Sequence, residues 1–93
     1  NITVNCISPG PFLTEINLPV LKNKKNYNDF CQKIPLRRFG NTSEILSSVI
    51  FLASDESSYV NGSEIVVDGG WTIKWILQLF LEGKTVKVSQ IKI

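Results

Sequence analysis

The sequence predicts an α/β fold built on a parallel sheet, and three segments carry the prediction. Residues 2–7 alternate between two faces, as a β-strand does. Residues 42–53 place apolar side chains at helical spacing, and residues 64–68 form a short β-branched run without alternation. Such a run suits a strand buried on both faces. The order strand, helix, strand implies a right-handed crossover in a layered fold.

The first strand is expected to end at the turn Ser8–Pro11, because proline cannot donate to a sheet ladder. Residues 12–26 have an irregular pattern, with Pro19 and a polar run over residues 22–26, so we predict a mobile loop there. A short helix follows, and Pro35 ends it. The apolar residues of this short helix, spaced at i, i+3, i+4 and i+7, are Tyr27, Phe30, Cys31 and Ile34.

The clearest helix is predicted over residues 42–53. Asn41 is a favourable N-cap, and the Glu44 side chain can accept a hydrogen bond from the Asn41 amide, as in a capping box. The predicted core-facing side chains are Ile45, Val49, Leu52 and Ala53, widened by Leu46 and Ile50, with Ser47 and Ser48 directed outward.

The composition excludes several classes of function. The 93 residues are 43% hydrophobic and 19% charged, with a net charge of +2 that is too small to indicate nucleic-acid binding. Cys6 and Cys31 match no metal-ligand spacing, and without histidine we expect no metal site and two buried apolar thiols. The apolar stretch after Gly70 is shorter than the about 20 residues that span a bilayer. With no signal peptide visible, a cytoplasmic protein is favoured.

Four blocks resemble the short-chain dehydrogenase/reductase family, in that family's order and spacing. Asn5–Gly10 followed by Thr14 resembles its sixth-strand motif, and residues 34–40 are similar to the segment before its last long helix. Residues 50–62 are similar to the end of that helix and its turn, and residues 64–71 to the final strand with Asp68-Gly69-Gly70-Trp71. The resemblance implies the C-terminal part of a Rossmann-type doubly wound parallel sheet: sixth strand, substrate loop, long helix and last strand. The domain part is residues 1–72, and residues 73–93 form an atypical tail of unknown role.

The resemblance also implies a cofactor site for NAD or NADP made by Pro9, Gly10, Phe12 and Thr14. Pro9 and Gly10 would form a turn of little bulk that lets the backbone approach the nicotinamide ring. The Phe12 backbone would pair with the nicotinamide carboxamide, and the Thr14 hydroxyl would add a hydrogen bond. Taken from the residues alone, Pro9-Gly10 can be a simple turn, and Thr14 can cap the turn that follows it.

Residues 13–35 resemble the family's variable substrate loop. The run of Lys22, Lys24 and Lys25 is interpreted as a solvated loop. Five apolar residues either line a pocket or pack the loop, and the sequence leaves both open: Leu18, Val20, Leu21, Tyr27 and Phe30.

The family's catalytic and phosphate-binding motifs do not occur in these 93 residues. No T-G-x-x-x-G-x-G spacing is present, and Y-x-x-x-K is absent because Cys31 and Ser63 stand four residues after Tyr27 and Tyr59. We therefore assign no catalytic residue and expect this chain alone to be inactive and to bind the cofactor weakly.

The expected parent is a homo-oligomeric oxidoreductase that interconverts a small secondary alcohol and a ketone. It would be similar to 3-oxoacyl-(acyl-carrier-protein) reductases or sugar dehydrogenases. The alternative is a non-catalytic module that assembles with a full-length subunit.

Overall fold

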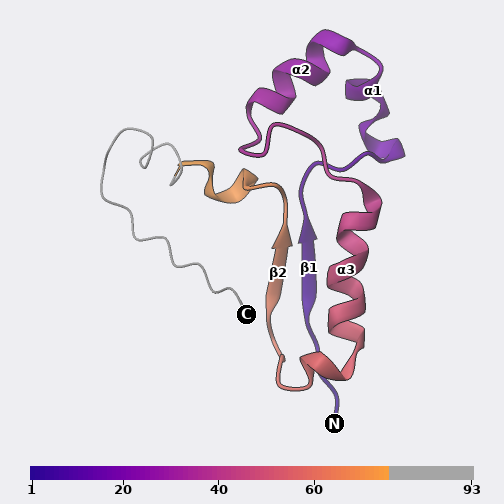
Figure 1. Cartoon of the computed structure of the whole chain (residues 1–93), viewed down its shortest axis with the longest axis vertical. Coiled ribbons are helices and arrows are strands. Elements are labelled where there is room, and N and C mark those ends of the chain that lie inside the picture. The colour runs from indigo at the N-terminus through magenta and orange to yellow at the C-terminus, as the bar shows by residue number, and fades with distance from the viewer. Residues whose placement is uncertain (76–93) are drawn as a thin grey trace.

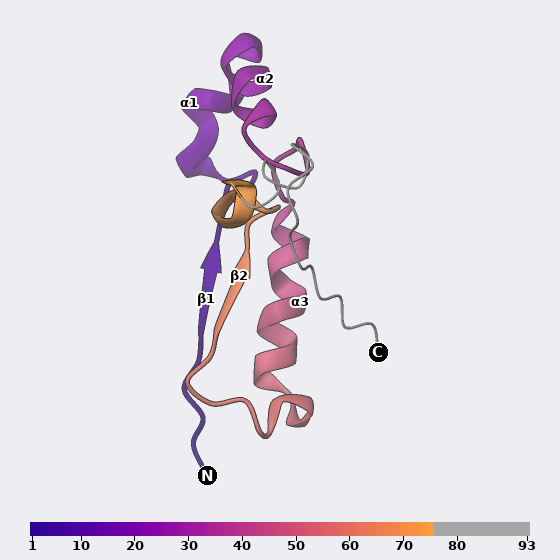
Figure 2. The same cartoon turned by 90° about the vertical axis from the view of Figure 1, so that its left-hand side faces the viewer.

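The computed structural model describes residues 1–75, and its centre is a parallel pair of strands joined through a helix (Figure 1). Strand β1 (Cys6–Pro9) pairs in parallel with β2 (Glu64–Val67), with Ile7 opposite Ile65. Helix α3 (Thr42–Ala53) is the longest of three helices in the connection between them, and it lies along one side of the pair in both views (Figures 1 and 2). The predicted α/β class with a parallel sheet is thus confirmed.

The first strand lies further along the chain than predicted. Val4 and Asn5 are hydrogen-bonded to the turn before β2 and not to a strand, and Ile2 and Val4 are 86% and 70% exposed. The Val4 amide donates to Asn61 Oδ1 at 2.9 Å, and its carbonyl oxygen accepts from Gly62 at 2.7 Å. Pro9 is the last strand residue instead of a terminator. The amides of Cys6 and Gly10 donate toward β2, so the Pro9 nitrogen faces the other edge and removes no hydrogen bond from this ladder.

Strand β2 alternates in burial, against the prediction of a strand buried on both faces. Ile65 and Val67 are half-buried, whereas Val66 between them is 45% exposed. Within residues 1–75 only α3 covers the pair, so one face of β2 is covered and the other is open (Figure 2).

The predicted loop over residues 12–26 is wrong for most of its length. A 3-10 turn (Glu15–Asn17) leads into α1 (Leu18–Leu21), where Pro19 stands in the first turn and its missing N–H removes no helical bond. Helix α2 (Lys24–Gln32) then begins at the N-cap Asn23, whose Oδ1 accepts from the Asn26 amide at 3.2 Å. The short helix is therefore confirmed, and it begins earlier and ends two residues before Ile34.

Helix α3 has the predicted bounds and the predicted start, since Glu44 Oε1 accepts from the Asn41 amide at 3.0 Å. Its orientation differs from the prediction. Ser48 is half-buried, because it shares one face with Ile45 and Leu52 at helical spacing. The other large apolar residues of the helix are on open faces, with exposed fractions from 40% to 59%: Leu46, Val49, Ile50 and Phe51. Ala53, predicted to face the core, is exposed as well.

The buried core lies beyond the carboxyl ends of the strands, between α2 and the segment before α3. Cys31, Ile34 and Phe39 form it, and partly buried neighbours that include Tyr27, Phe30 and Trp71 pack against it. The prediction of two buried thiols is confirmed for Cys31 and wrong for Cys6, which is exposed on the sheet. Two further 3-10 turns, Asp55–Ser57 and Trp71–Ile73, follow α3 and β2. Most of the predicted tail, residues 76–93, lies outside the described part of the chain.

Candidate functional site

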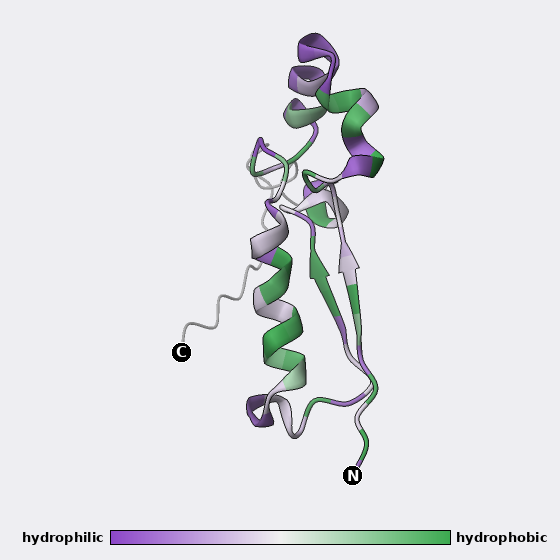
Figure 3. Cartoon of the chain, turned by 90° about the vertical axis from the view of Figure 1, so that its right-hand side faces the viewer, coloured by the Kyte–Doolittle hydropathy of each residue, from purple (hydrophilic) through white to green (hydrophobic). Residues whose placement is uncertain are grey.

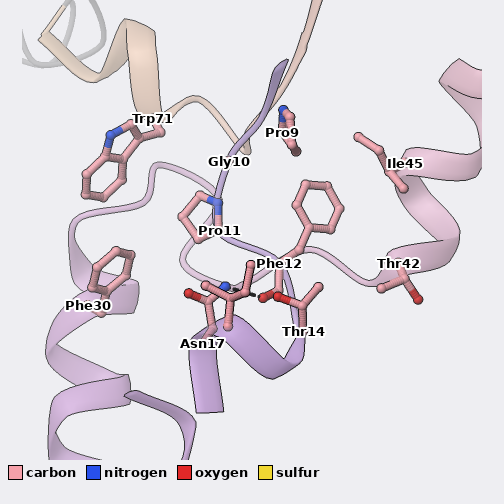
Figure 4. A pocket seen from close by; sticks show the side chains of 11 residues that line it. Pro9, Gly10, Pro11, Phe12, Thr14, Asn17, Phe30, Thr42, Ile45 and Trp71 are labelled. Atoms are coloured by element: carbon pink, nitrogen blue, oxygen red, sulfur yellow. Dashed lines mark hydrogen bonds between the residues drawn. The ribbon is translucent and has the colours of Figure 1, made fainter. Parts of the chain in front are cut away.

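An open cavity of about 660 Å³ lies at the carboxyl ends of the two strands. This is the edge at which α/β sheets bind ligands. The polar residues lining it are Thr14, Asn17 and Thr42, and Gly10 and Phe12 line it as well. Its remaining lining is apolar and comes from Pro9, Pro11, Ile16, Phe30, Ile45 and Trp71 (Figure 4). The four sequence-predicted site residues, Pro9, Gly10, Phe12 and Thr14, therefore line one cavity.

Gly10 is required here for a reason that the sequence did not indicate. A Cβ on Gly10 would lie 2.6 Å from Asp68 Cα and closer still to Asp68 Cβ. The Gly10 amide also donates to the Val67 carbonyl oxygen at 2.9 Å. The absent side chain thus lets β1 and the end of β2 meet, which explains the glycine without any ligand.

The Phe12 backbone has one donor that no described residue uses, and it has no free acceptor. Its carbonyl oxygen accepts two hydrogen bonds, from the Thr14 amide at 2.9 Å and from Asn17 Nδ2 at 2.6 Å. Phe12 also forms a parallel bridge with Gly40. The hydrogen bonds of that bridge are made by the Pro11 carbonyl oxygen and the Leu13 amide, and the Phe12 amide takes no part. Among residues 1–75, no group accepts from that amide.

The Phe12 ring fixes this backbone segment in place. The ring is buried against Gly40, where an added Cβ would lie 2.6 Å from the ring carbon Cε1. The amide donor is therefore held on an anchored segment, which is the condition for orienting a ligand.

Thr14 is half-buried beside this donor, in extended conformation before the 3-10 turn that begins at Glu15. Its side chain makes no capping hydrogen bond to that turn, so the capping interpretation is not borne out. In the described part of the chain the hydroxyl has no hydrogen-bond partner, and it can both donate to and accept from a ligand.

Two aromatic side chains that the sequence did not assign to the site form another part of the lining. Phe30 and Trp71 stack with ring centroids 5.3 Å apart and an interplanar angle of 7°. Lys74 Nζ lies 3.8 Å from the centroid of the Trp71 ring. The helical spacing of α2 identifies Phe30 as inward-facing, but no local signal indicates its partner some forty residues later.

The turn Asp68-Gly69-Gly70 positions Trp71. Asp68 Oδ1 accepts from the Gly70 amide at 2.9 Å and Oδ2 from the Thr72 amide at 3.0 Å, while Gly69 and Gly70 have φ of 64° and 94°. Burial acts to raise the pKa of the Asp68 carboxyl, but these hydrogen bonds to the ionised form outweigh it and the pKa lies below its usual value. Asp68 is therefore ionised at neutral pH and keeps the turn closed.

No acid/base pair of the Y-x-x-x-K kind is formed by the described tyrosines. A hydrogen bond with Cys31, assisted by burial, raises the pKa of Tyr27, which is the wrong direction for a base at neutral pH. Tyr59 is fully exposed on the turn before β2. Over residues 1–75, no cluster of His, Cys, Asp and Glu has the makeup of a metal site, and no helix has the length and apolar character to cross a membrane.

The parallel β-α-β unit with a cavity at its strand ends defines a Rossmann-like α/β protein. A family model described as enoyl-(acyl carrier protein) reductase matches residues 1–72. The chain belongs to the short-chain dehydrogenase/reductase family.

Relatives and solved structures agree with this membership. An oxidoreductase of Escherichia coli is 40% identical over 74 residues, which cover 80% of this chain and 28% of the relative. The 3-oxoacyl-(acyl-carrier-protein) reductase of Chlamydia trachomatis is 44% identical over 70 residues, covering 75% and 27%. A gluconate 5-dehydrogenase from Burkholderia cenocepacia, solved with NADP and tartrate, has a TM-score of 0.72 and 38% identity, covering 77% and 28%. The chain thus spans less than a third of the length of each of these proteins.

Proposed function

We propose that this chain supplies the nicotinamide-facing edge of an NAD(P)(H)-dependent oxidoreductase that interconverts a secondary alcohol and a ketone. The observation that carries the proposal is that two residues lining one cavity each have an unused polar group. Neither the Phe12 amide nor the Thr14 hydroxyl has a hydrogen-bond acceptor within residues 1–75. A nicotinamide carboxamide has one carbonyl acceptor and one amide donor, which matches these two groups.

The Phe12 backbone makes fewer hydrogen bonds to the carboxamide in this proposal than the family resemblance implies. Because the Phe12 carbonyl oxygen already accepts two hydrogen bonds, its amide donates to the carboxamide oxygen and does not act as half of a two-way pair. The carboxamide N–H then donates to Thr14 Oγ1. NAD or NADP supplies the hydride chemistry when bound, and these two residues orient its ring. Pro9 and Gly10 contribute through the backbone position, since Asp68 occupies the space beside Gly10.

Residues 1–72 form the domain part of this proposal, equivalent to the sixth strand, substrate loop, long helix and last strand of a larger sheet. The chain alone is inactive, because neither the phosphate loop nor the tyrosine and lysine acid/base pair occurs in its sequence. Measurable oxidation of NADH or NADPH by the purified 93-residue chain would overturn this statement.

The cofactor role is tested by placing residues 1–72 in the Burkholderia gluconate 5-dehydrogenase, in exchange for its matching segment. The chimera is expected to bind NADPH and to reduce at least one ketone of a panel that includes a 3-oxoacyl thioester and a keto sugar acid. Thr14→Val is expected to weaken NADPH binding about tenfold, the value of about one hydrogen bond, whereas Thr14→Ser retains it. Equal binding by the valine and serine variants contradicts the proposed role of Thr14.

A second candidate function is assembly, with a homologous subunit or a second copy of the chain. The observation that favours it is the open apolar surface of α3, formed by the exposed side chains of Leu46, Val49, Ile50 and Phe51. Figure 3 shows that much of α3 consists of hydrophobic residues. Co-purification with a full-length relative, abolished by a charged residue on this surface, supports assembly. A monomer that binds no relative refutes it.

A further inference from the structure

The stacked pair of Phe30 and Trp71 lines a part of the cavity that the proposed nicotinamide contacts do not use. Figure 4 shows both rings together on one side, whereas Phe12 and Thr14 lie beyond Pro11, toward Ile45 and Thr42. The two rings come from α2 and from the turn after β2, and they are brought together only by the fold. We call this pair the aromatic wall.

Contacts within the chain hold the aromatic wall in place. Phe30 stacks on Trp71 at 7°, and the Lys74 ammonium lies over the Trp71 ring at 3.8 Å. The Asp68 carboxylate fixes the backbone on both sides of Trp71 through the amides of Gly70 and Thr72. A preordered apolar surface loses little entropy on binding, so it is suited to contact a ligand.

The polar side chains that residues 1–75 contribute to the cavity lining are few for a ligand rich in hydroxyls. Thr14, Asn17 and Thr42 are the polar side chains of the lining, and Asn17 Nδ2 already donates to the Phe12 carbonyl oxygen at 2.6 Å. A polyol brings a hydroxyl on nearly every carbon, and each one buried without a partner costs binding. An aliphatic chain or ring gains binding from the same surface with every methylene that it buries.

We propose that the aromatic wall binds the apolar part of the ketone or alcohol substrate, so that this site selects aliphatic acyl or alicyclic substrates over polyhydroxylated ones. The proposal rests on the proposed oxidoreductase function and names the substrate class of that same site. Phe30 and Trp71 are its specificity-determining residues.

The test uses the full 93-residue chain and two probes, the N-acetylcysteamine thioester of 3-oxooctanoic acid and gluconate, followed by ¹H–¹⁵N NMR. The thioester is expected to shift the Trp71 indole N–H and the Phe30 amide in a saturable way, and gluconate at equal concentration is not. Trp71→Ala is expected to weaken thioester binding at least about tenfold, whereas Trp71→Phe, which keeps a stacked ring, retains most of it. Trp75→Ala is the matched control, because Trp75 is exposed and outside the cavity lining, and it is expected to bind as the unchanged chain does.

Three results overturn the proposal: no saturable shift at the wall with the thioester, equal binding of gluconate there, or equal effects of Trp71→Ala and Trp75→Ala. Amide dispersion of Trp71→Ala is recorded first. If that variant is unfolded, Trp71→Leu carries the test, because it keeps an apolar side chain without a stacked ring and is expected to bind the thioester more weakly than Trp71→Phe does. A separate titration with reduced nicotinamide mononucleotide reads Phe12 and Thr14. Failure of that titration counts against the nicotinamide site, while failure of the thioester titration counts against the wall.

Discussion

The two ends of this molecule differ in how completely they bury their apolar side chains. At the carboxyl end of the strands, Ile34 and Phe39 are 1% and 3% exposed, inside a shell of aromatic rings. Along the strands, by contrast, α3 and Val66 leave large apolar side chains open to solvent. The cavity belongs to the first region, and it is assembled from residues far apart in the sequence.

The difference indicates which region depends on contacts with another protein chain to bury its apolar side chains. The site region buries its own core, because α2, the segment before α3 and the turn after β2 pack against one another. The sheet region has one covering helix in the described part of the chain, so its free faces gain most from association. Substitutions in the site region should therefore mainly lower stability, whereas substitutions on the open surface of α3 should mainly lower association.

Replacement of Phe39 tests the first half of the comparison and has the largest expected effect. Phe39 lies 5.3 Å, centroid to centroid, from both Tyr27 and Phe30. Phe39→Ala is expected to cost about 3–5 kcal/mol of unfolding free energy, enough to unfold a chain of this size. Ile50→Ala, on the open surface of α3, is the control and is expected to cost less than about 0.5 kcal/mol. Urea unfolding followed by circular dichroism measures both, and similar losses in the two variants would contradict the comparison.

Gly10 tests the junction between the regions. Gly10→Ala places a methyl group against Asp68 and is expected to cost about 1–3 kcal/mol. Gly62 is the matched control, since nothing lies within 4 Å of an added Cβ and only its φ of 77° opposes a side chain. Gly62→Ala should therefore cost about 1 kcal/mol. Thermal or urea unfolding that ranks Gly62→Ala as the more damaging change refutes the packing role of Gly10.

The open surface of α3 tests the second half of the comparison, with an expected effect on association and little on folding. Ile50→Lys is expected to reduce self-association, seen as a lower mass in light scattering at equal concentration, while the helical signal is unchanged. Ser58→Lys adds the same charge at an exposed position outside α3 and serves as control. If both variants lower the mass equally, net charge explains the result and the apolar surface does not.

The ion pair at the start of α3 has the smallest expected effect. Arg38 donates to Glu44 at 2.6 and 2.9 Å, and this bond, with that from the Asn41 amide, lowers the pKa of Glu44 from 4.5 to about 2. Because the folded pKa is the lower one, the pair stabilises the fold above pH 4.5 and the contribution is lost as pH falls toward 2. Both side chains are exposed, so the effect is small and weakens with salt.

Glu44→Gln should remove that pH-dependent component and leave the stability near pH 2 unchanged. Unfolding midpoints between pH 2 and 7 measure it, with Glu56→Gln, at an exposed position of the 3-10 turn that follows α3, as control. An unaltered pH profile in Glu44→Gln would show that the pair does not act in solution.

The sequence predicts the parts of the fold that depend on local pattern. The capped helix over residues 42–53 and the parallel pairing follow from spacing and element order, and the structure confirms both. The wrong predictions concern residues whose conformation or burial depends on contacts with other segments of the chain. Residues 2–5 have strand character but face a turn, and Ser48 is polar but lies on the face that its spacing with Ile45 and Leu52 selects.

The candidate site divides in the same way. The family motif brings Pro9, Gly10, Phe12 and Thr14 to the cavity, and the structure places all four in its lining. The motif does not indicate that Asp68 explains Gly10, that the Phe12 carbonyl oxygen is already engaged, or that Trp71 stacks on Phe30. Each of these is a contact between distant segments, which no local pattern encodes.

The most direct test of the central claim is the ¹H–¹⁵N NMR titration of the full chain with reduced nicotinamide mononucleotide, which carries the carboxamide and needs no pyrophosphate site. We predict saturable shifts at the amide of Phe12 and at Thr14, lost in Thr14→Val and kept in Thr14→Ser. Shifts confined to other residues, or a response that the valine variant retains in full, would contradict the claim that Phe12 and Thr14 orient the nicotinamide.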